Sequence, residues 1–151
     1  MVENTKRQQQ VKQFIEKFGL VAEKWSMPRM AGRILGYLMI CEPPLQSAAQ
    51  LAEAIGSSLG SISSMQRLLI HNGLVKKVGV SGESSIYLQL TDDFMVLVLQ
   101  LEMEPLITLL RSAKHGLEIL KDKSAKQRQR LQNMYDLSRE LSIITARWPG
   151  K

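Results

Sequence analysis

Hydrophobic side chains recur every three or four residues near the start of the chain, at Val11, Phe14, Ile15, Phe18 and Val21. This spacing places them on one face of a helix. A second helical stretch runs from about residue 29 to 41. It should end at Pro43-Pro44, because proline cannot donate a backbone hydrogen bond and restricts the residue before it. The first forty residues therefore predict two helices.

Two shorter helices are predicted next from their capping residues. Ser47 and Gln50 have the spacing of a capping box, which opens a helix through Ile55. Gly56 follows and can supply the positive φ of a tight turn. Ser57 or Ser58 then caps a helix that continues to about His71. The two capping sites and Gly56 therefore predict two helices joined by a glycine turn.

The hydrophobic period changes after Gly73. Residues 74–80 and 86–90 read as two short strands around a hairpin tip at 81–85. From Thr91 the chain is helical again, and Pro105 predicts a kink or a break. A last helix runs from about Ser124 to Trp148. Its apolar residues recur as a seam that needs a partner helix: Leu131, Met134, Leu137, Leu141, Ile144 and Trp148.

The element order predicts a mostly α fold with a small β-hairpin wing, a winged helix-turn-helix flanked by helices. We expect an N-terminal dimerisation helix at 1–27, a DNA-binding domain at 28–90 and a C-terminal helical dimerisation region at 91–151. In the second motif helix, Ile62, Leu69 and either Met65 or Gln66 face the core. The opposite face then presents Ser58, Ser61, Ser64 and Arg67, the side that would enter a major groove.

Charge and composition narrow the function classes. The 151 residues carry a net charge of +6, which is compatible with a polyanionic partner. The single cysteine, Cys41, allows no intramolecular disulfide and fits a reducing cytoplasm. The longest apolar run, 94–99, is far shorter than the ~20 residues needed to cross a bilayer. We therefore expect a cytoplasmic protein. Neither histidine has a partner at catalytic spacing, and we expect no enzyme activity, cofactor or metal.

Residues from about 25 to 90 resemble the MarR superfamily of bacterial regulators, and most closely its GbsR-like branch. The resemblance is carried by PRMAGRILGYL at 28–38, PP at 43–44, SAAQLAEAIGSS at 47–58, GSIS at 60–63, Leu69, and NGLV at 72–75. It implies a homodimeric, sequence-specific DNA-binding regulator acting on a pseudo-palindromic operator. One departure is the wing tip, where the family usually has Arg or Lys and this chain has Ser-Gly-Glu-Ser-Ser.

The helix-turn-helix motif and the family resemblance together predict residues for three kinds of site: a DNA-binding surface, a dimer interface and an effector pocket. The DNA-binding candidates are Ser47, Ser57, Ser58, Gly60, Ser61, Ser63, Ser64, Arg67, Lys76 and Lys77. The dimer-interface candidates are Phe14, Phe18, Leu131, Met134, Leu137, Leu141, Ile144 and Trp148. Phe18, Trp25 and Tyr37 are first of all core positions, but they could line an effector pocket. The resemblance implies that such a pocket would hold a quaternary ammonium ligand through cation–π contacts.

Three features of the sequence each allow two roles. Arg29 and Arg33 could contact phosphates or donate structural hydrogen bonds. Cys41 could be a buried small hydrophobic residue or a redox sensor. The whole domain could also be a winged-helix protein-interaction module that has lost strong DNA binding, an alternative motivated by the missing wing-tip base.

Overall fold

Two helices at the start of the chain, α1 (Val2–Lys24) and α2 (Arg29–Ile40), pack against each other through small residues. Gly19 and Ala22 of α1 are buried against Gly32 of α2, and Gly36, one turn further along α2, lies against Phe18 and Ile15. Larger side chains, among them Ile34 and Leu35, then fill the interior beside this contact. The close approach makes α1 part of the same compact unit as the helix-turn-helix, and the unit ends at Phe94. The computed structural model describes residues 1–147.

The helix-turn-helix consists of α3 (Ala48–Ile55) and α4 (Leu59–His71). The predicted capping box is present, since Ser47 Oγ accepts from the amide of Gln50 and the Gln50 side chain accepts from the amide of Ser47. Gly56 has a φ of 70°, as the predicted turn requires. Of the two serines, Ser58 is the cap of α4. Side chains from both helices, including Leu51, Ile62 and Leu69, are fully buried.

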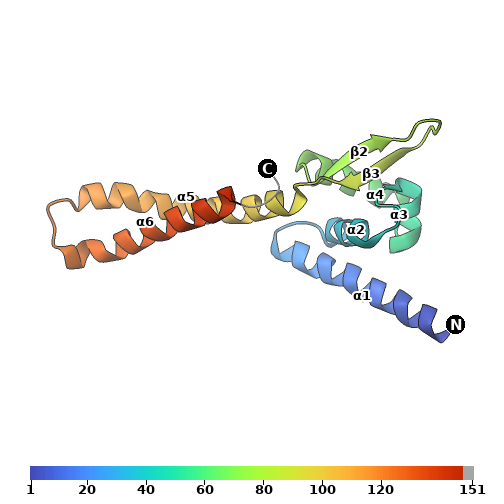
Figure 1. Cartoon of the computed structure of the whole chain (residues 1–151), viewed down its shortest axis with the longest axis horizontal. Helices are drawn as coiled ribbons and strands as arrows, with labels where there is room; N and C mark the ends of the chain where they lie inside the picture. The colour runs from blue at the N-terminus through green and yellow to red at the C-terminus, as the bar shows by residue number, and fades with distance from the viewer. Residues whose placement is uncertain (148–151) are drawn as a thin grey trace. The chain divides into compact units, whose positions relative to one another are not determined.

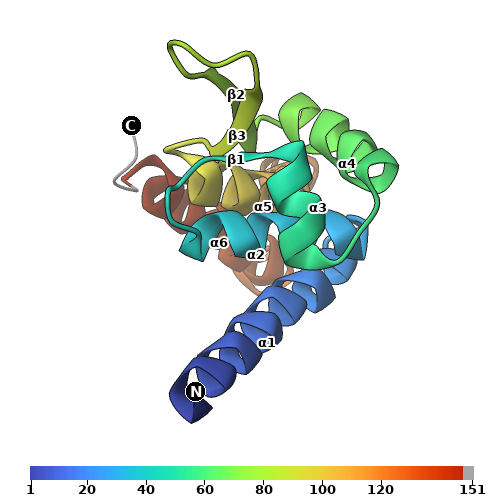
Figure 2. The same ribbon diagram turned by 90° about the vertical axis from the view of Figure 1, so that its right-hand side faces the viewer.

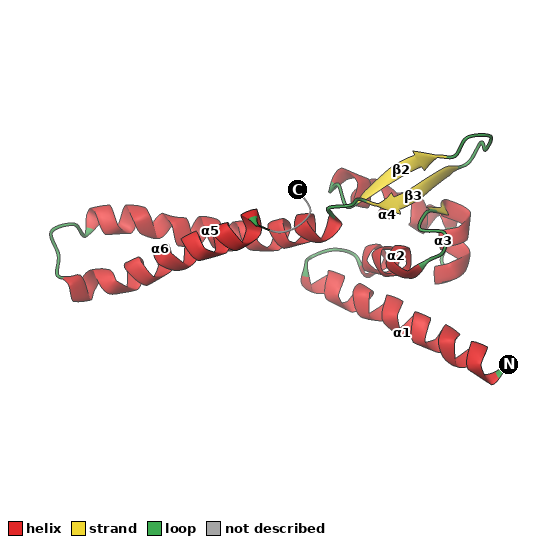
Figure 3. Cartoon of the chain, viewed as in Figure 1, coloured by secondary structure: helices red, strands yellow, loops and turns green. Residues whose placement is uncertain are grey.

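A small antiparallel sheet completes this first unit, with strands β1 (Gln46–Ser47), β2 (Val75–Gly79) and β3 (Ile86–Leu90) in the order β1-β3-β2 (Figure 3). The predicted hairpin is confirmed. Figure 2 shows it beside α4, with its tip projecting away from the helices. The strand β1 was not predicted, because two residues are too few to show a strand period. Tertiary pairing forms it, with Gln46 opposite Leu88.

The second compact unit contains two long helices, α5 (Phe94–Ile119) and α6 (Ala125–Ala146), drawn in yellow to red in Figure 1. Leu131 of α6 lies against Gly116 of α5, where an added Cβ would be 2.8 Å from a Leu131 methyl carbon. The helix α5 continues through Pro105, so of the predicted kink or break the break is wrong, and the kink stays a prediction. Proline removes one helical hydrogen bond, and here the flanking turns continue the helix. The predicted seam residue Trp148 lies outside the described residues.

The fold class predicted from the sequence is confirmed: the molecule is mostly helical with a small antiparallel sheet. The finer division at residues 27 and 90 stays a prediction. Within the described part of the chain, no helix has the length and apolar character that a membrane crossing would require.

Candidate nucleic-acid interface

The helix α4 has one buried side and one exposed side. Ile62 and Leu69 are 0% exposed, whereas Ser61, Ser64 and Arg67 are exposed. Met65 and Gln66 are both half-buried and lie at the border between the two sides. The orientation of α4 predicted from the sequence is thus confirmed, and the polar row is free to meet a partner. DNA contact by these residues stays a prediction.

The start of α4 carries an ordered group of hydroxyls. Ser58 Oγ accepts from the amide of Ser61 at 3.2 Å and donates to Ser61 Oγ at 3.0 Å. This arrangement leaves the Ser61 hydroxyl hydrogen available to an outside acceptor. Further along the same side, Arg67 Nη2 lies 3.5 Å from Ser64 Oγ. Ser58 and Ser47 therefore have a structural role as helix caps, while Ser61, Ser64 and Arg67 keep donors for a partner.

Gly60 opens the same side to close approach. A Cβ added there would meet only Ser58 Oγ, at 4.0 Å, so packing within the chain does not require a glycine. Glycine inside a helix is about 1 kcal/mol less favourable than alanine. A shallow depression of about 360 Å³ borders this position, lined by Pro28, Met30, Gly60, Ser61, Ser64 and Met65. The absence of a side chain is consistent with a partner that approaches the backbone here.

The two lysines of β2 lie on opposite faces of the sheet, because successive strand residues alternate. Both are exposed. Lys76 Nζ lies 3.8 Å from a carboxylate oxygen of Asp92, and Lys77 is opposite Leu88 in the pairing register. The structure therefore does not bring the two predicted phosphate contacts to one face.

The wing tip carries an acid held in place by a neighbouring ring. Residues 81–85 are exposed, and Glu83 accepts a hydrogen bond from the hydroxyl of Tyr87. This bond raises the pKa of Tyr87, because the carboxylate favours the protonated phenol. The tip thus presents an oriented negative charge where a minor-groove contact would need a positive one.

Arg29 and Arg33 hold α1 and α2 together. Both donate to Glu16 of α1, Arg29 through Nη2 and Arg33 through Nε at 2.8 Å. These hydrogen bonds lower the pKa of Glu16, the bond from Arg29 contributing most. The structural hydrogen bonds, one of the two alternatives left open by the sequence, are therefore present, and phosphate contact by these arginines stays a prediction. The sequence offers no signal for Glu16, because its partners lie 13 and 17 residues away.

The three aromatic residues nominated for an effector pocket have different neighbours. Phe18 packs over Gly36 and pairs with Phe14, with ring centroids 5.1 Å apart. Trp25 is half-buried at the end of α1. Burial raises the pKa of Tyr37, which lies near Cys41 and Glu53. An aromatic cage built from these rings stays a prediction.

Cys41 is half-buried rather than fully buried. Its thiol lies 3.7 Å from the carbonyl oxygen of Leu38. Burial raises the pKa of the Cys41 thiol, which disfavours the reactive thiolate form. These surroundings favour the small hydrophobic residue over the redox sensor.

Known transcriptional regulators are similar to this chain over most of its length. No protein-family model matches the chain. The HTH-type transcriptional regulator MmpR5 of Mycobacterium tuberculosis is 33% identical over 127 residues, which span 84% of this chain and 77% of MmpR5. A crystal structure of a transcriptional regulator matches with a TM-score of 0.60 and 31% identity, over 91% of this chain and 93% of that one. Wild-type MarR from E. coli is more distant, with a TM-score of 0.45 and 14% identity over 85% and 87%.

Proposed function

Because the chain belongs to the HTH-type transcriptional regulators, we propose that it is of the MarR type and binds double-stranded operator DNA as a homodimer. The observation that carries this proposal is the exposed row of Ser61, Ser64 and Arg67, opposite the buried Ile62 and Leu69. In winged helix-turn-helix proteins the second motif helix enters the major groove. The helix α4 is that helix here.

The polar groups at and before the start of α4 have roles in the proposed complex. Ser61, Ser63 and Ser64, which are exposed, and Ser57, which is half-buried, donate hydrogen bonds to phosphates or base edges, and their small size permits close approach. Arg67 supplies the positive charge nearest to this row. Lys76 and Lys77 contact phosphates from the wing strand, each from its own face. The net charge of +6 favours association with DNA.

The homodimer is supported by apolar surface that one chain leaves uncovered. In the second unit Leu101, Leu109, Ile119, Leu137 and Ile144 are each 46% exposed or more. In the first unit Phe14 is 36% exposed beside Phe18. Contiguous apolar surface is rare on monomers and marks interfaces. We assign Met134 and Leu141 to the same interface because they follow the seam of α6, whereas Leu131 packs on Gly116 of α5 within the chain.

The GbsR-like branch is a finer part of the proposal. It rests on the strings at 28–38 and 47–58 together with the glycine turn. A regulator of this branch would have the same dimeric architecture, so the tests below do not depend on the branch.

Footprinting on the promoter region of the protein's own gene and its neighbours, at near-physiological salt, tests DNA binding. We expect a protected site with two-fold symmetry and half-sites about one helical turn apart, ~34–36 Å. Equal affinity for the promoter and for random duplex DNA would overturn the proposal.

Dimerisation has a separate test. Changing both Leu137 and Leu141 to Glu should convert the dimer to a monomer, as measured by light scattering, and leave only weak, salt-sensitive DNA association. The matched control changes Gln129 and Asn133, exposed polar residues on the same helix, to Glu. A wild-type protein that is monomeric at micromolar concentration contradicts the homodimer.

The acidic wing tip favours a second candidate, a winged domain that docks a protein instead of DNA. Salt dependence separates the two. A protein with several phosphate contacts loses affinity steeply as salt rises, since each contact releases condensed counterions. Weak binding with a shallow salt slope would support the docking function.

A further inference from the structure

A pocket between α5 and α6 gathers three cationic side chains that no role described above uses. It has a volume of about 450 Å³ and is lined by Arg111 and Lys114 from α5 and by Tyr135, Arg139 and Ile143 from α6, among others. This volume lies within the ~300–1,000 Å³ typical of small-molecule sites. The sequence offers no signal for it, because the two helices contribute residues that lie more than twenty positions apart.

The charge of the pocket is one-sided. Among the described residues, its lining includes three cations and no carboxylate. Glu104 lies 3.8 Å from Arg111 Nη1, but both side chains are more than half exposed, so this pair contributes little. An anion entering the pocket would accept hydrogen bonds from guanidinium and ammonium groups. Hydrogen bonds from such charged donors are stronger than those from neutral donors.

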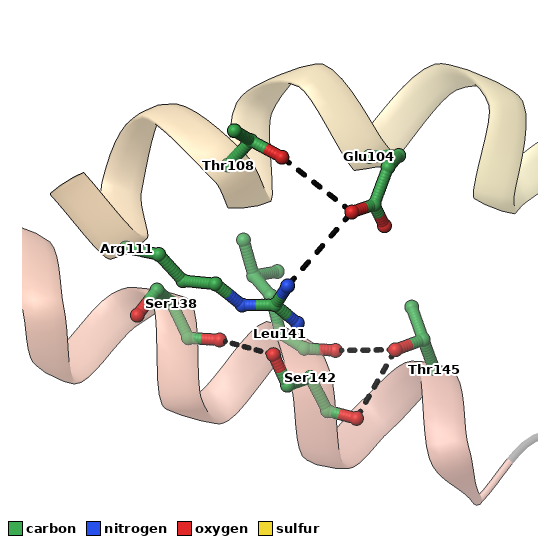
Figure 4. Close-up of polar contacts among 7 residues, drawn as sticks. All are labelled: Glu104, Thr108, Arg111, Ser138, Leu141, Ser142 and Thr145. Atoms are coloured by element: carbon green, nitrogen blue, oxygen red, sulfur yellow. Dashed lines mark hydrogen bonds and ion pairs between the residues drawn. The ribbon is translucent and has the colours of Figure 1, made fainter.

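The wall formed by α6 offers few polar hydrogens. Ser138 donates to the carbonyl oxygen of Tyr135 at 2.6 Å, and Ser142 donates to that of Ser138 at 2.8 Å. Figure 4 shows the Arg111 side chain reaching from α5 toward these serines of α6. Most of the exposed lining is apolar, and it includes Ile143 and the stems of the long side chains. The donors that remain are Arg111, Lys114, Arg139 and the Tyr135 hydroxyl.

We propose that this pocket binds an amphipathic organic anion. The head group lies among Arg111, Lys114 and Arg139, and the apolar body lies against Ile143 and the Tyr135 ring. The charge of this ligand is opposite to that of the quaternary ammonium effector implied by the sequence resemblance. The site lies wholly within the α5–α6 unit, so the inference does not depend on DNA binding.

The pocket and the proposed dimer seam occupy different sides of α6. Leu137 and Arg139 are two residues apart and so project about 160° from each other around the helix. A partner chain that covers Leu137 and Ile144 therefore leaves Arg139 open to a ligand. Occupancy of the pocket and dimerisation are compatible.

The test uses the full chain and three probes with the same ten-carbon tail, titrated by calorimetry below their micelle concentrations. Decyl phosphate is anionic, decyltrimethylammonium is cationic and decyl glucoside is neutral. We expect decyl phosphate to bind about tenfold or more tightly than either of the others, because hydrogen bonds to charged groups contribute more than neutral ones. Co-sedimentation of the protein with phosphatidylglycerol vesicles shows whether the anion can also come from a membrane lipid.

Matched variants locate the binding. Changing Lys114 and Arg139 together to Gln should weaken decyl phosphate about tenfold or more. Changing Lys126 and Arg130, exposed cations outside the pocket, to Gln removes the same charge and should have no such effect. Ile143→Ser should weaken the binding without any change of charge. Circular dichroism on each variant verifies folding.

Three results would overturn the proposal. One is equal affinity for all three probes, which indicates adsorption of the tail alone. Another is equal weakening by the two charge-matched double variants, which indicates a diffuse charge effect. The last is a preference for decyltrimethylammonium, which points to the aromatic cage instead.

Discussion

Gly32 of α2 lies directly against Ala22 of α1, so that a Cβ atom added to Gly32 would be 2.5 Å from the Cβ of Ala22. The same added atom would be 2.9 Å from the Cα of Gly19. Two helices can approach this closely only where both carry small residues. The position of α1 therefore depends on the absence of a side chain at Gly32.

Gly32→Ala should destabilise the protein by about 1–3 kcal/mol, because the extra methyl group meets backbone and has nowhere to go. Thermal or urea denaturation measures this loss. Gly60→Ala is the matched control, since its added Cβ meets only one atom at 4.0 Å. That control should keep wild-type stability or gain up to about 1 kcal/mol. Equal stability of the two variants would refute the close packing of α1 on α2.

Gly56→Val should lower both the melting temperature and the DNA affinity. No atom of residues 1–147 lies within 4 Å of an added Cβ, so the loss comes from the φ of 70°. A β-branched residue held there costs about 1–3 kcal/mol. Gly56→Asn should recover most of the stability, because asparagine tolerates the left-handed conformation. If Val and Asn behave alike, the left-handed turn is not the cause.

Arg67→Ala should weaken operator binding by about 1–3 kcal/mol and leave the melting temperature unchanged. Arg67 is exposed, and its hydrogen bond to Ser64 is long, at 3.5 Å. Fluorescence anisotropy with an operator duplex measures the affinity. Arg130→Ala, which removes an exposed cation from α6, is the control. Unchanged operator affinity in Arg67→Ala would show that another side of α4 faces the DNA.

Glu16→Gln should lower stability at neutral pH and lose its effect in acid. The arginines hold the pKa of Glu16 below its ordinary value of 4.5 in the folded protein. The stabilisation is therefore present above pH 4.5 and disappears as the pH falls through the lower, folded value. Melting temperatures of both proteins between pH 7 and pH 3 should converge at the acid end. A constant difference across that range would contradict the ion pair.

Glu83→Lys should strengthen DNA binding and steepen its salt dependence. The variant removes the acid held by Tyr87 and places a base at the wing tip. One new phosphate contact changes the slope of log affinity against log salt by about 0.9. Random-sequence duplex DNA is a sufficient probe. Glu118→Lys, on the exposed surface of α5, makes the same charge change as a control. If both variants respond equally, the wing does not approach DNA.

The sequence alone determined the local features of this protein. The capping box at Ser47 and Gln50, the turn at Gly56 and the two strands of the hairpin were predictable, because each depends on residues within a few positions of one another. The exposed side of α4 could be predicted in the same way, since helical spacing places Ile62 and Leu69 on one side of the helix and Ser61 and Arg67 on the other. Local hydrogen bonds and side-chain periodicity depend only on residues that are close together in the sequence, so the sequence is enough to predict them.

Only the tertiary structure decided which distant residues meet. It joined Arg29 and Arg33 to Glu16, paired β1 with β3, and gathered Arg111, Lys114 and Arg139 around one pocket. It also kept α5 continuous through Pro105. An exposed arginine has the same sequence signature whether its partner is a phosphate, a carboxylate or water. Its role depends on the group that the fold brings within hydrogen-bond distance, and that group can lie anywhere along the chain.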